Sequence, residues 1–151
     1  SGGGSAESIN SVEGVLYADV SFKSSSVTSQ ITISNDANFS NGIIRLYVLS
    51  GSNTLRAGVF DGTNWKWEYA ININTNDNNK IALRWGSDVL SLFVNGIKQT
   101  GATNQSSFTL SGLDKLNLAY FNNADPFLGN VKQIINFPTA LTDAECISLT
   151  S

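Results

Sequence analysis

The sequence predicts an all-β protein, an antiparallel sandwich of two β-sheets that ends in one short helix. Three observations lead to this fold class. Clusters of turn-forming Asn, Asp, Gly and Ser recur about every ten residues, a spacing typical of sandwiches and barrels. Apolar and polar residues alternate between these clusters, and a helix-capping pattern follows the last alternating segment.

The alternating segments identify the expected strands. In each of them the apolar residues occupy every second position, so one side can be buried while the other meets solvent or a second layer. The segments cover residues 16–22, 31–33, 44–48, 55–59, 81–85, 90–94 and 116–120. Trp85 is in phase with the apolar set of its strand and is expected in the core. Asn95-Gly96 gives the sharpest hairpin signal, because both residues accept the positive φ of a type I′ turn.

The C-terminal segment combines a strand with a helix start. Residues 127–137 alternate, and Pro138 ends the strand because proline has no N–H to donate to a ladder. The stretch 142–145, Thr-Asp-Ala-Glu, matches a capping box, in which the first and fourth side chains bond each other's backbone N–H groups. Leu141 is placed to pack on Cys146 across this cap. We therefore expect a short helix pressed onto the sandwich.

Composition and charge indicate a single folded module and argue against nucleic acid as a partner. The chain has 151 residues, of which 41% are hydrophobic, and its net charge of -3 comes with scattered Lys and Arg rather than a basic surface. We expect neither a membrane span nor a signal peptide, because the sequence has no apolar run long enough for either. Residues 1–11 are expected to be a linker or an added segment, and residues 12–151 the domain, a module of a longer polypeptide.

The sequence contains no histidine and only one cysteine, Cys146. Without histidine the chain lacks the usual general base and the usual zinc ligand, and one cysteine cannot form an internal disulfide. Carboxylate chemistry and hard cations such as calcium stay open. Because no Asp-x-Asp-x-Asp loop is present, we expect no metal and no cofactor.

Three stretches resemble the laminin-G-like, concanavalin A-type superfamily of lectins and glucanases. They are EGVLYADVSF (13–22), NKIALRWGSDVLSLFVNGIKQ (79–99) with its Val-Asn-Gly hairpin, and FLGNVKQIINFPTALTDAE (127–145). The resemblance covers most of the chain after residue 12 and implies a jelly roll, in which the closing strand lies beside the opening one. It therefore predicts that residues 127–137 pair with residues 14–22 in one antiparallel sheet.

The opening and closing stretches are most similar to modules of bacteriophage tail fibres and related virion proteins. This resemblance implies receptor or glycan binding at a virion surface or in the extracellular space, within a larger polypeptide that could form a homotrimer. The same sandwich also occurs in secreted lectin-like modules and in enzymes, so the fold alone does not decide the context.

The acidic residues do not support catalysis. Glycoside hydrolases of this superfamily carry a tight Glu-x-Asp-x-x-Glu run, which places an acid and a nucleophile across one bond. This sequence has no such run, and its only acidic pair at a spacing of two, Asp143 and Glu145, is explained by the helix cap and the helix dipole. We expect no catalytic residue and no enzymatic activity, and keep a polysaccharide hydrolase or lyase as the third hypothesis.

The stretch DGTNWKWEY, residues 61–69, is the most informative candidate binding segment. Strand alternation would place Trp65, Trp67 and Tyr69 on one face, where flat rings could stack on sugars while Asp61 bonds their hydroxyl groups. The alternative is that this face belongs to the core.

A second candidate surface lies on the polar side of the third and fourth strands. Arg45, Tyr47 and Arg56 share this side and could bond hydroxyl groups or a sugar carboxylate, unless the side is only a solvated sheet face. Two loops offer further oxygen ligands or sugar contacts, or only satisfy turn geometry. They hold Asn35, Asp36, Asn38, Asn122, Asn123 and Asp125.

These observations favour a non-catalytic module that binds a carbohydrate or a cell-surface receptor. Its partners would be a glycan or host receptor and the rest of a larger polypeptide, with no nucleic acid and no membrane insertion. The alternative is a structural or oligomerisation module of the same assembly, without a ligand of its own.

Overall fold

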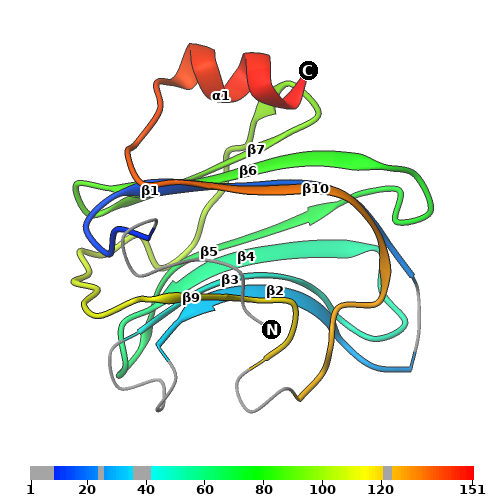
Figure 1. Cartoon of the computed structure of the whole chain (residues 1–151), viewed down its shortest axis with the longest axis horizontal. Coiled ribbons are helices and arrows are strands. Elements are labelled where there is room, and N and C mark those ends of the chain that lie inside the picture. Colours follow the sequence, from blue (N-terminus) through cyan, green and yellow to red (C-terminus); the bar gives the residue numbers. More distant parts are fainter. Residues whose placement is uncertain (1–8, 24–25, 36–41, 121–123) are drawn as a thin grey trace.

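The computed structural model describes residues 9–23, 26–35, 42–120 and 124–151 of the chain. In this part of the chain, two five-stranded antiparallel sheets pack face to face and one helix lies outside them (Figure 1). The predicted all-β sandwich with a short C-terminal helix is confirmed. Among the described residues, no helix has the length and apolar character that a membrane span requires.

Each sheet combines strands that are far apart in the sequence. The first sheet has the order β10 (Gly129–Phe137), β1 (Gly14–Phe22), β6 (Asn79–Gly86), β7 (Val89–Val94) and β8 (Ile97–Lys98). The second has the order β5 (Trp65–Asn72), β4 (Thr54–Phe60), β3 (Ile43–Val48), β2 (Ser29–Ser34) and β9 (Lys115–Asn117). The helix α1 spans Asp143–Thr150.

The core fills the space between the two sheets. Apolar side chains at alternate positions of β1, β6 and β7 meet those of β2, β3 and β4, as the alternation predicted. Trp85 is fully buried there, and its indole Nε1 donates a hydrogen bond to the Asn10 carbonyl oxygen over 3.0 Å. Tyr69 also lies in the core and donates its hydroxyl to the Leu90 carbonyl oxygen over 2.9 Å. Both aromatic residues thus stabilise the fold, because their polar tips are satisfied inside it.

The closing strand β10 pairs antiparallel with the opening strand β1, as predicted. The ladder contains one bulge, because Asp19 lies opposite Gln133 whereas Val20 lies opposite Val131. The extra residue, Lys132, shifts the alternation of side chains along β10. The single alternating pattern expected over the whole strand is therefore interrupted.

The helix α1 begins at the predicted capping box. Thr142 Oγ1 accepts the Glu145 backbone N–H over 3.2 Å, and Glu145 Oε2 accepts the Thr142 backbone N–H over 2.7 Å. The helix packs on outward-facing side chains of the first sheet. There Val15, Ala82 and Phe93 of the sheet form a cluster with Cys146 of the helix, and Phe137 and Leu141 pack at its edge.

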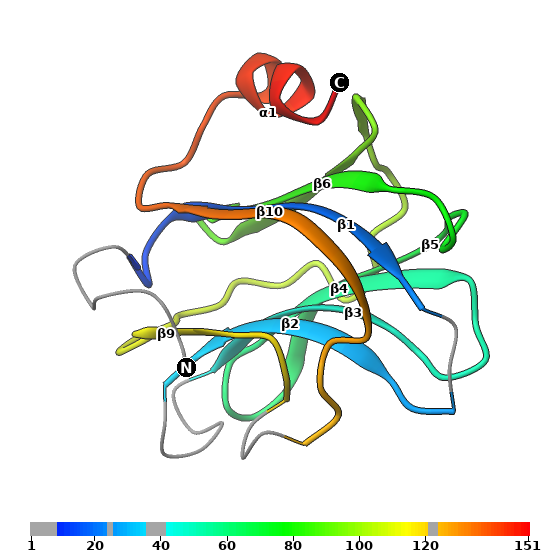
Figure 2. The same ribbon diagram turned by 45° about the vertical axis from the view of Figure 1, so that its right-hand side comes forward.

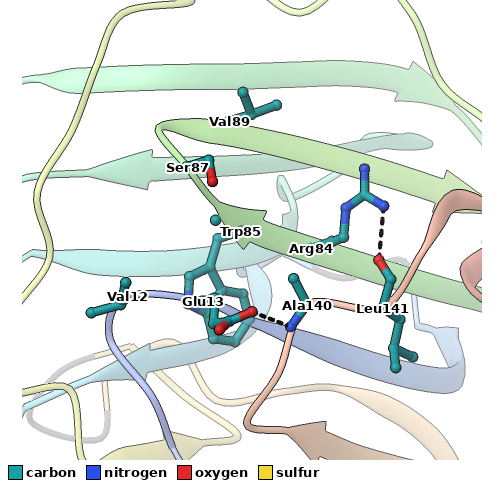
Figure 3. Close-up of a pocket in the computed structure, with 9 residues that line it drawn as sticks. Val12, Glu13, Arg84, Trp85, Ser87, Val89, Ala140 and Leu141 are labelled. Atoms are coloured by element: carbon teal, nitrogen blue, oxygen red, sulfur yellow. Dashed lines mark hydrogen bonds between the residues drawn. The ribbon is translucent and has the colours of Figure 1, made fainter.

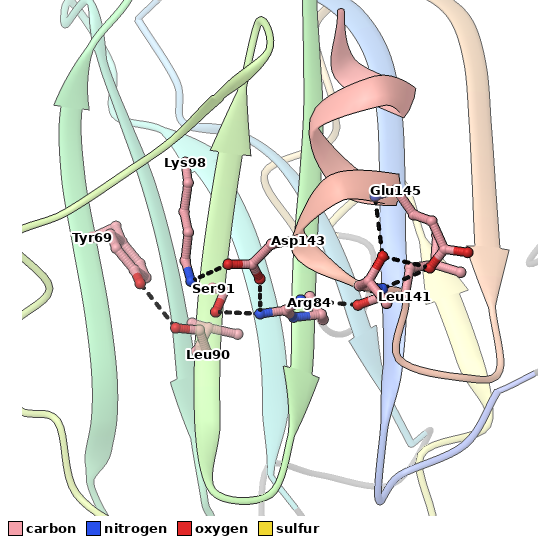
Figure 4. A network of polar contacts seen from close by, with 9 residues as sticks. Tyr69, Arg84, Leu90, Ser91, Lys98, Leu141, Asp143 and Glu145 are labelled. Atoms are coloured by element: carbon pink, nitrogen blue, oxygen red, sulfur yellow. Dashed lines mark hydrogen bonds and ion pairs between the residues drawn. The ribbon is translucent and has the colours of Figure 1, made fainter.

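Ion pairs also hold α1 on the first sheet (Figure 4). Asp143 pairs with Arg84 over 2.6 Å and with Lys98 over 2.7 Å. The hydrogen bond from Lys98 is the main reason why the pKa of Asp143 lies below its ordinary value, and Arg84 adds to this effect. The helix thus covers the outer face of the first sheet, whereas the outer face of the second sheet carries no helix among the described residues (Figure 2).

Candidate functional site

The outer face of the second sheet gathers the arginines and the tyrosine singled out from the sequence. On β3 and β4 the core takes every second residue, so Arg45, Tyr47 and Arg56 point to the outer side. Across the ladders, Gln30 of β2 lies opposite Tyr47, and Tyr47 lies opposite Arg56. These three residues form a row across three strands, with Arg45 beside it.

Arg45 is held in place by its neighbours. Its Nε donates to Gln30 Oε1 over 2.8 Å, and its guanidinium carbon lies 3.8 Å from the ring centroid of Tyr47 and 4.6 Å from that of Tyr120. Burial lowers the pKa of Arg45 below its ordinary value, although the two tyrosines and the Asp125 carboxylate act in the opposite direction. Arginine stays protonated under such conditions. The face therefore contains one fixed cation.

Gln30 connects this arginine to the loop that precedes β10. Its side chain is fully buried, and its Nε2 donates to the Asp125 carbonyl oxygen over 3.1 Å while its Oε1 accepts from Arg45. The backbone of Asp125 is thus bound to the face, and the residue itself is exposed. The neighbouring candidates Asn122 and Asn123 lie outside the described residues.

Arg56 differs from Arg45 because no hydrogen bond or ion pair of its side chain is found among the described residues. It is half-buried, and its Nε is buried without a hydrogen-bond partner in the described part of the chain. The ion pairs found among these residues do not include it. The residue opposite Arg56 on β5 is Ala70, which is small and exposed. A buried donor of this kind costs about 1 to 3 kcal/mol when left unpaired. Because Arg56 as a whole is only half-buried, an acceptor from outside the chain can approach its guanidinium group.

The residues Trp65, Trp67 and Tyr69 do not share one face, and this prediction is wrong. The register between β4 and β5 shifts, because Val59 lies opposite Trp67 whereas Phe60 lies opposite Trp65. The extra residue in β5 turns Trp65 to the outer side of the sheet. Trp67 packs against the core and Tyr69 lies within it.

Trp65 lies over Gly58 on the outer face. A Cβ atom placed on Gly58 would come within 2.8 Å of Trp65 Cζ3, so only glycine leaves room for the indole. The Trp65 ring also contacts Phe60, with 5.5 Å between ring centroids. Gly58 lies opposite Arg45 on β3 and two positions after Arg56 on β4. The glycine that the indole covers is therefore a neighbour of both arginines in the sheet.

The carboxylate of Asp61 is bound within the turn between β4 and β5. Its Oδ1 accepts the backbone N–H groups of Thr63 and Asn64 over 2.9 and 3.0 Å, and its Oδ2 pairs with Lys66 over 3.2 Å. Burial acts to raise the pKa of Asp61, but these bonds together bring it below its ordinary value. This carboxylate therefore shapes the turn. Of the other loop candidates, Asp36 and Asn38 lie outside the described residues, while Asn35 follows β2.

A separate pocket of about 420 Å³ lies between the start of β1, the β6–β7 turn and the segment before α1 (Figure 3). The carboxylate of Glu13 accepts the Ala140 backbone N–H over 2.8 Å, and Arg84 donates to the Leu141 carbonyl oxygen over 2.9 Å. These bonds anchor the segment that leads into α1. The polar groups of this pocket thus serve the fold.

The outer face offers hydrogen bonds, positive charge and aromatic stacking. No group of three or more His, Cys, Asp or Glu side chains that could hold a metal ion occurs in residues 9–23, 26–35, 42–120 and 124–151. The thiol of Cys146 is buried between α1 and the first sheet, and this burial raises its pKa, so it is not a reactive group.

Three residues of this face were missed by sequence reasoning. Gln30 and Gly58 had usable signals, since a polar residue alternating with buried isoleucines faces outward and a glycine inside a strand marks a close approach. Tyr120 had none, because its contact with Arg45 joins segments distant in the sequence.

The two antiparallel sheets, with one face covered by a helix and one open, define a jelly-roll β-sandwich. The model of the concanavalin A-like lectin/glucanases superfamily matches residues 16–146. The chain belongs to this superfamily, as its motifs suggested. Among curated proteins, no sequence gives a significant match.

Solved structures with the same fold include carbohydrate-binding modules. The CBM40 of the Ruminococcus gnavus IT-sialidase bound to α2,3-sialyllactose is similar with a TM-score of 0.70 and 18% identity, over 94% of this chain and 84% of that chain. The same module bound to α2,6-sialyllactose has a TM-score of 0.71 and 16% identity, over 99% of this chain and 93% of that chain. A heptameric SAP-like pentraxin from Limulus polyphemus has a TM-score of 0.66 and 13% identity, over 95% of this chain and 73% of that chain. At these identities the similarity shows the fold.

Proposed function

We propose that the protein is a non-catalytic module that binds a glycan containing a carboxylated sugar on the outer face of its second sheet. The observation that carries this proposal is Arg56, whose Nε is buried without a partner among the described residues. A carboxylate matches a guanidinium group with two parallel hydrogen bonds, which makes arginine well suited to such ligands. The similar CBM40 structures contain sialyllactose, which has a carboxylated sugar, and this supports the ligand class.

The arginines of this face favour an anion at Arg56. Arg45 lies on the strand next to Arg56 and is fixed by Gln30, and neither arginine takes part in the ion pairs found among the described residues. Of the acidic residues on this side, Glu68 of β5 accepts from Asn104 and the Asp125 carboxylate acts on Arg45, whereas no ion pair of Arg56 is found among the described residues. A ligand carboxylate would thus meet positive charge that is already positioned, which reduces the cost of ordering on binding.

Calorimetric titration of the full chain with α2,3-sialyllactose and with lactose tests the proposal. We expect binding of sialyllactose only, and a loss of about tenfold or more in affinity for Arg56→Gln, because a hydrogen bond between charged groups is removed. Lys132→Gln is the matched control: it removes one positive charge from the exposed bulge in β10 of the other sheet. Equal affinity for the two sugars, or an unchanged affinity of Arg56→Gln, would contradict the proposal.

The absence of catalysis is a separate part of the proposal. It is supported by the lack of histidine and by the capping role of Glu145, whose carboxylate is bound to Thr142. We expect no release of sialic acid from sialyllactose and no release of reducing sugar from polysaccharides. Turnover that a single Asp or Glu substitution abolishes would establish a hydrolase or lyase instead.

The biological context is also a proposal. Its support is the sequence resemblance to tail-fibre modules, which favours a host receptor as partner and a virion surface or extracellular location. Light scattering on the purified chain distinguishes a monomer from a homotrimer. A structural or oligomerisation module without its own ligand remains the alternative, and it predicts that wild type binds neither sialyllactose nor lactose. We propose no cofactor, and a chelator that lowers the melting temperature would instead reveal a calcium site.

A further inference from the structure

We propose that Trp65 forms a second sugar position beside Arg56, so that the ligand class is an acidic oligosaccharide in which a neutral ring follows the carboxylated one. The carboxylate pairs with Arg56, and the neutral ring stacks on the indole. This inference rests on the proposed binding face and specifies the length and order of the glycan on it.

The bulge between β4 and β5 is the first observation behind this inference. Trp65 lies opposite Phe60, and Trp67 lies opposite Val59, so the two tryptophans face opposite sides of the sheet. Trp67 joins the core, whereas Trp65 stays half-buried on the outer face. A regular strand would have placed both rings on the same side.

The glycine below the indole is the second observation. The six-membered ring of Trp65 covers Gly58, whose missing side chain allows the contact. The contact with Phe60, at 5.5 Å between centroids and an angle of 58° between the ring planes, braces the indole from the side. Because the ring is supported in this way and Trp65 is only half-buried, part of its surface is held open to the outer face. A fixed ring loses little conformational entropy when a sugar stacks on it.

The spacing along β4 is the third observation. Arg56 and Gly58 are two residues apart and point to the same side, which separates them by roughly 6.6 Å along the strand. This separation is comparable to that between neighbouring rings of an oligosaccharide. One ring bound through its carboxylate at Arg56 would therefore place the next ring over Gly58, where the indole lies.

A packing role for Trp65 is the alternative, because an aromatic ring that covers a glycine also stabilises a sheet. The two roles differ in what a loss of the ring changes. If the ring only packs, its removal affects stability and acts on all ligands alike. If it binds the second sugar, its removal weakens only ligands that have one.

The test compares a monosaccharide with a trisaccharide. Calorimetry on the full chain uses the methyl α-glycoside of N-acetylneuraminic acid and α2,3-sialyllactose as probes, for wild type, Trp65→Ala, Trp65→Phe and the control Ile97→Ala. Ile97 is 65% exposed on β8 of the other sheet. Melting curves establish which variants are folded at the titration temperature, and titrations are made below that limit.

We expect wild type to bind the trisaccharide more tightly than the monosaccharide. Trp65→Ala should lose about tenfold in affinity for the trisaccharide and less than about twofold for the monosaccharide, with Trp65→Phe between the two. An equal loss for both probes, or no loss for the trisaccharide, would overturn the second sugar position and leave the proposed function intact. If wild type binds neither probe, both proposals are wrong.

Discussion

The guanidinium carbon of Arg45 lies 3.8 Å from the ring centroid of Tyr47, and this tyrosine is only 8% exposed. The two residues belong to the same strand, β3, and point to the same side. Because the guanidinium group of Arg45 covers the Tyr47 ring, side chains on the polar face of the sheet also pack against one another. Arg45 therefore acts on both the stability of the sheet and the charge of the candidate site.

Replacing Arg45 with lysine should lower the free energy of unfolding by about 1 to 3 kcal/mol. Lysine lacks the planar group that covers Tyr47, and it leaves the buried Oε1 of Gln30 without its donor. Urea denaturation measures the change. Arg56→Lys serves as the comparison and should not destabilise the protein, because Arg56 has no partner among the described residues and the change removes a buried unpaired donor. Similar costs for both variants would show that Arg45 has no special structural role.

Replacing Gly58 with alanine should destabilise the protein by about 1 to 3 kcal/mol. The new Cβ would meet Trp65 Cζ3 at 2.8 Å and the Trp67 carbonyl oxygen at 3.0 Å. In a Trp65→Ala background the cost should fall, because one of these two contacts is gone. A double-mutant cycle by urea denaturation measures this coupling, which should exceed about 0.5 kcal/mol. Additive effects would mean that the indole does not rest on Gly58.

Replacing Trp67 with alanine should cost about 3 kcal/mol of stability, at the low end for tryptophan because the residue is only partly buried. Its indole Nε1 is buried without a hydrogen-bond partner among the described residues, so removing it recovers part of the loss. Thermal melts measure the change. Sialyllactose affinity at a temperature where the variant is folded should match wild type. A stable variant with reduced affinity would instead place Trp67 in the binding site.

The attachment of α1 should weaken in acid. The pKa of Asp143 is lower in the folded protein than its ordinary value, so its contribution to stability is complete above that value, about 3.9, and is lost as the pH falls through the lowered folded value. The contribution is less than about 1 kcal/mol, since the Asp143 side chain is 48% exposed.

The contribution of Asp143 is measured by comparing the free energy of unfolding of wild type with that of Asp143→Asn across pH. The pKa values of Asp61 and Glu145 are also lowered, so the wild-type curve alone does not isolate Asp143. The variant should be less stable than wild type at pH 7 and equally stable near pH 2. A difference that persists at pH 2 would show that Asp143 acts through something other than its charge.

Most of the fold could be predicted because it depends on local patterns. Alternation located the buried faces of β1, β3, β4, β6 and β7, and Asn95-Gly96 located the tight turn between β7 and β8, where both residues have positive φ. The capping box placed the start of α1. These signals work because strand periodicity, turn chemistry and helix capping each involve only a few neighbouring residues.

The bulges could not be predicted in the same way. One extra residue in β5 placed Trp65 and Trp67 on opposite sides, and one in β10 shifted the alternation at Lys132. A bulge is defined by the partner strand, so its position is set by tertiary pairing. For the same reason the sequence indicated that Arg45 and Arg56 share a face, but not that Gln30 binds Arg45 while the Nε of Arg56 has no partner in the described part of the chain.

The position of the C-terminus beside α1 also determines how the domain can be oriented on a solid support. The C-terminal end lies beside α1, across both sheets from the outer face of the second sheet (Figure 1). A sensor chip or bead linked at Ser151 would hold every molecule with that face directed toward the solution. Coupling through lysines would give mixed orientations, since Lys66 belongs to β5 of the second sheet and Lys132 to β10 of the first. Uniform orientation allows neighbouring molecules to engage a multivalent glycan together, so avidity should be greater on the C-terminally linked surface.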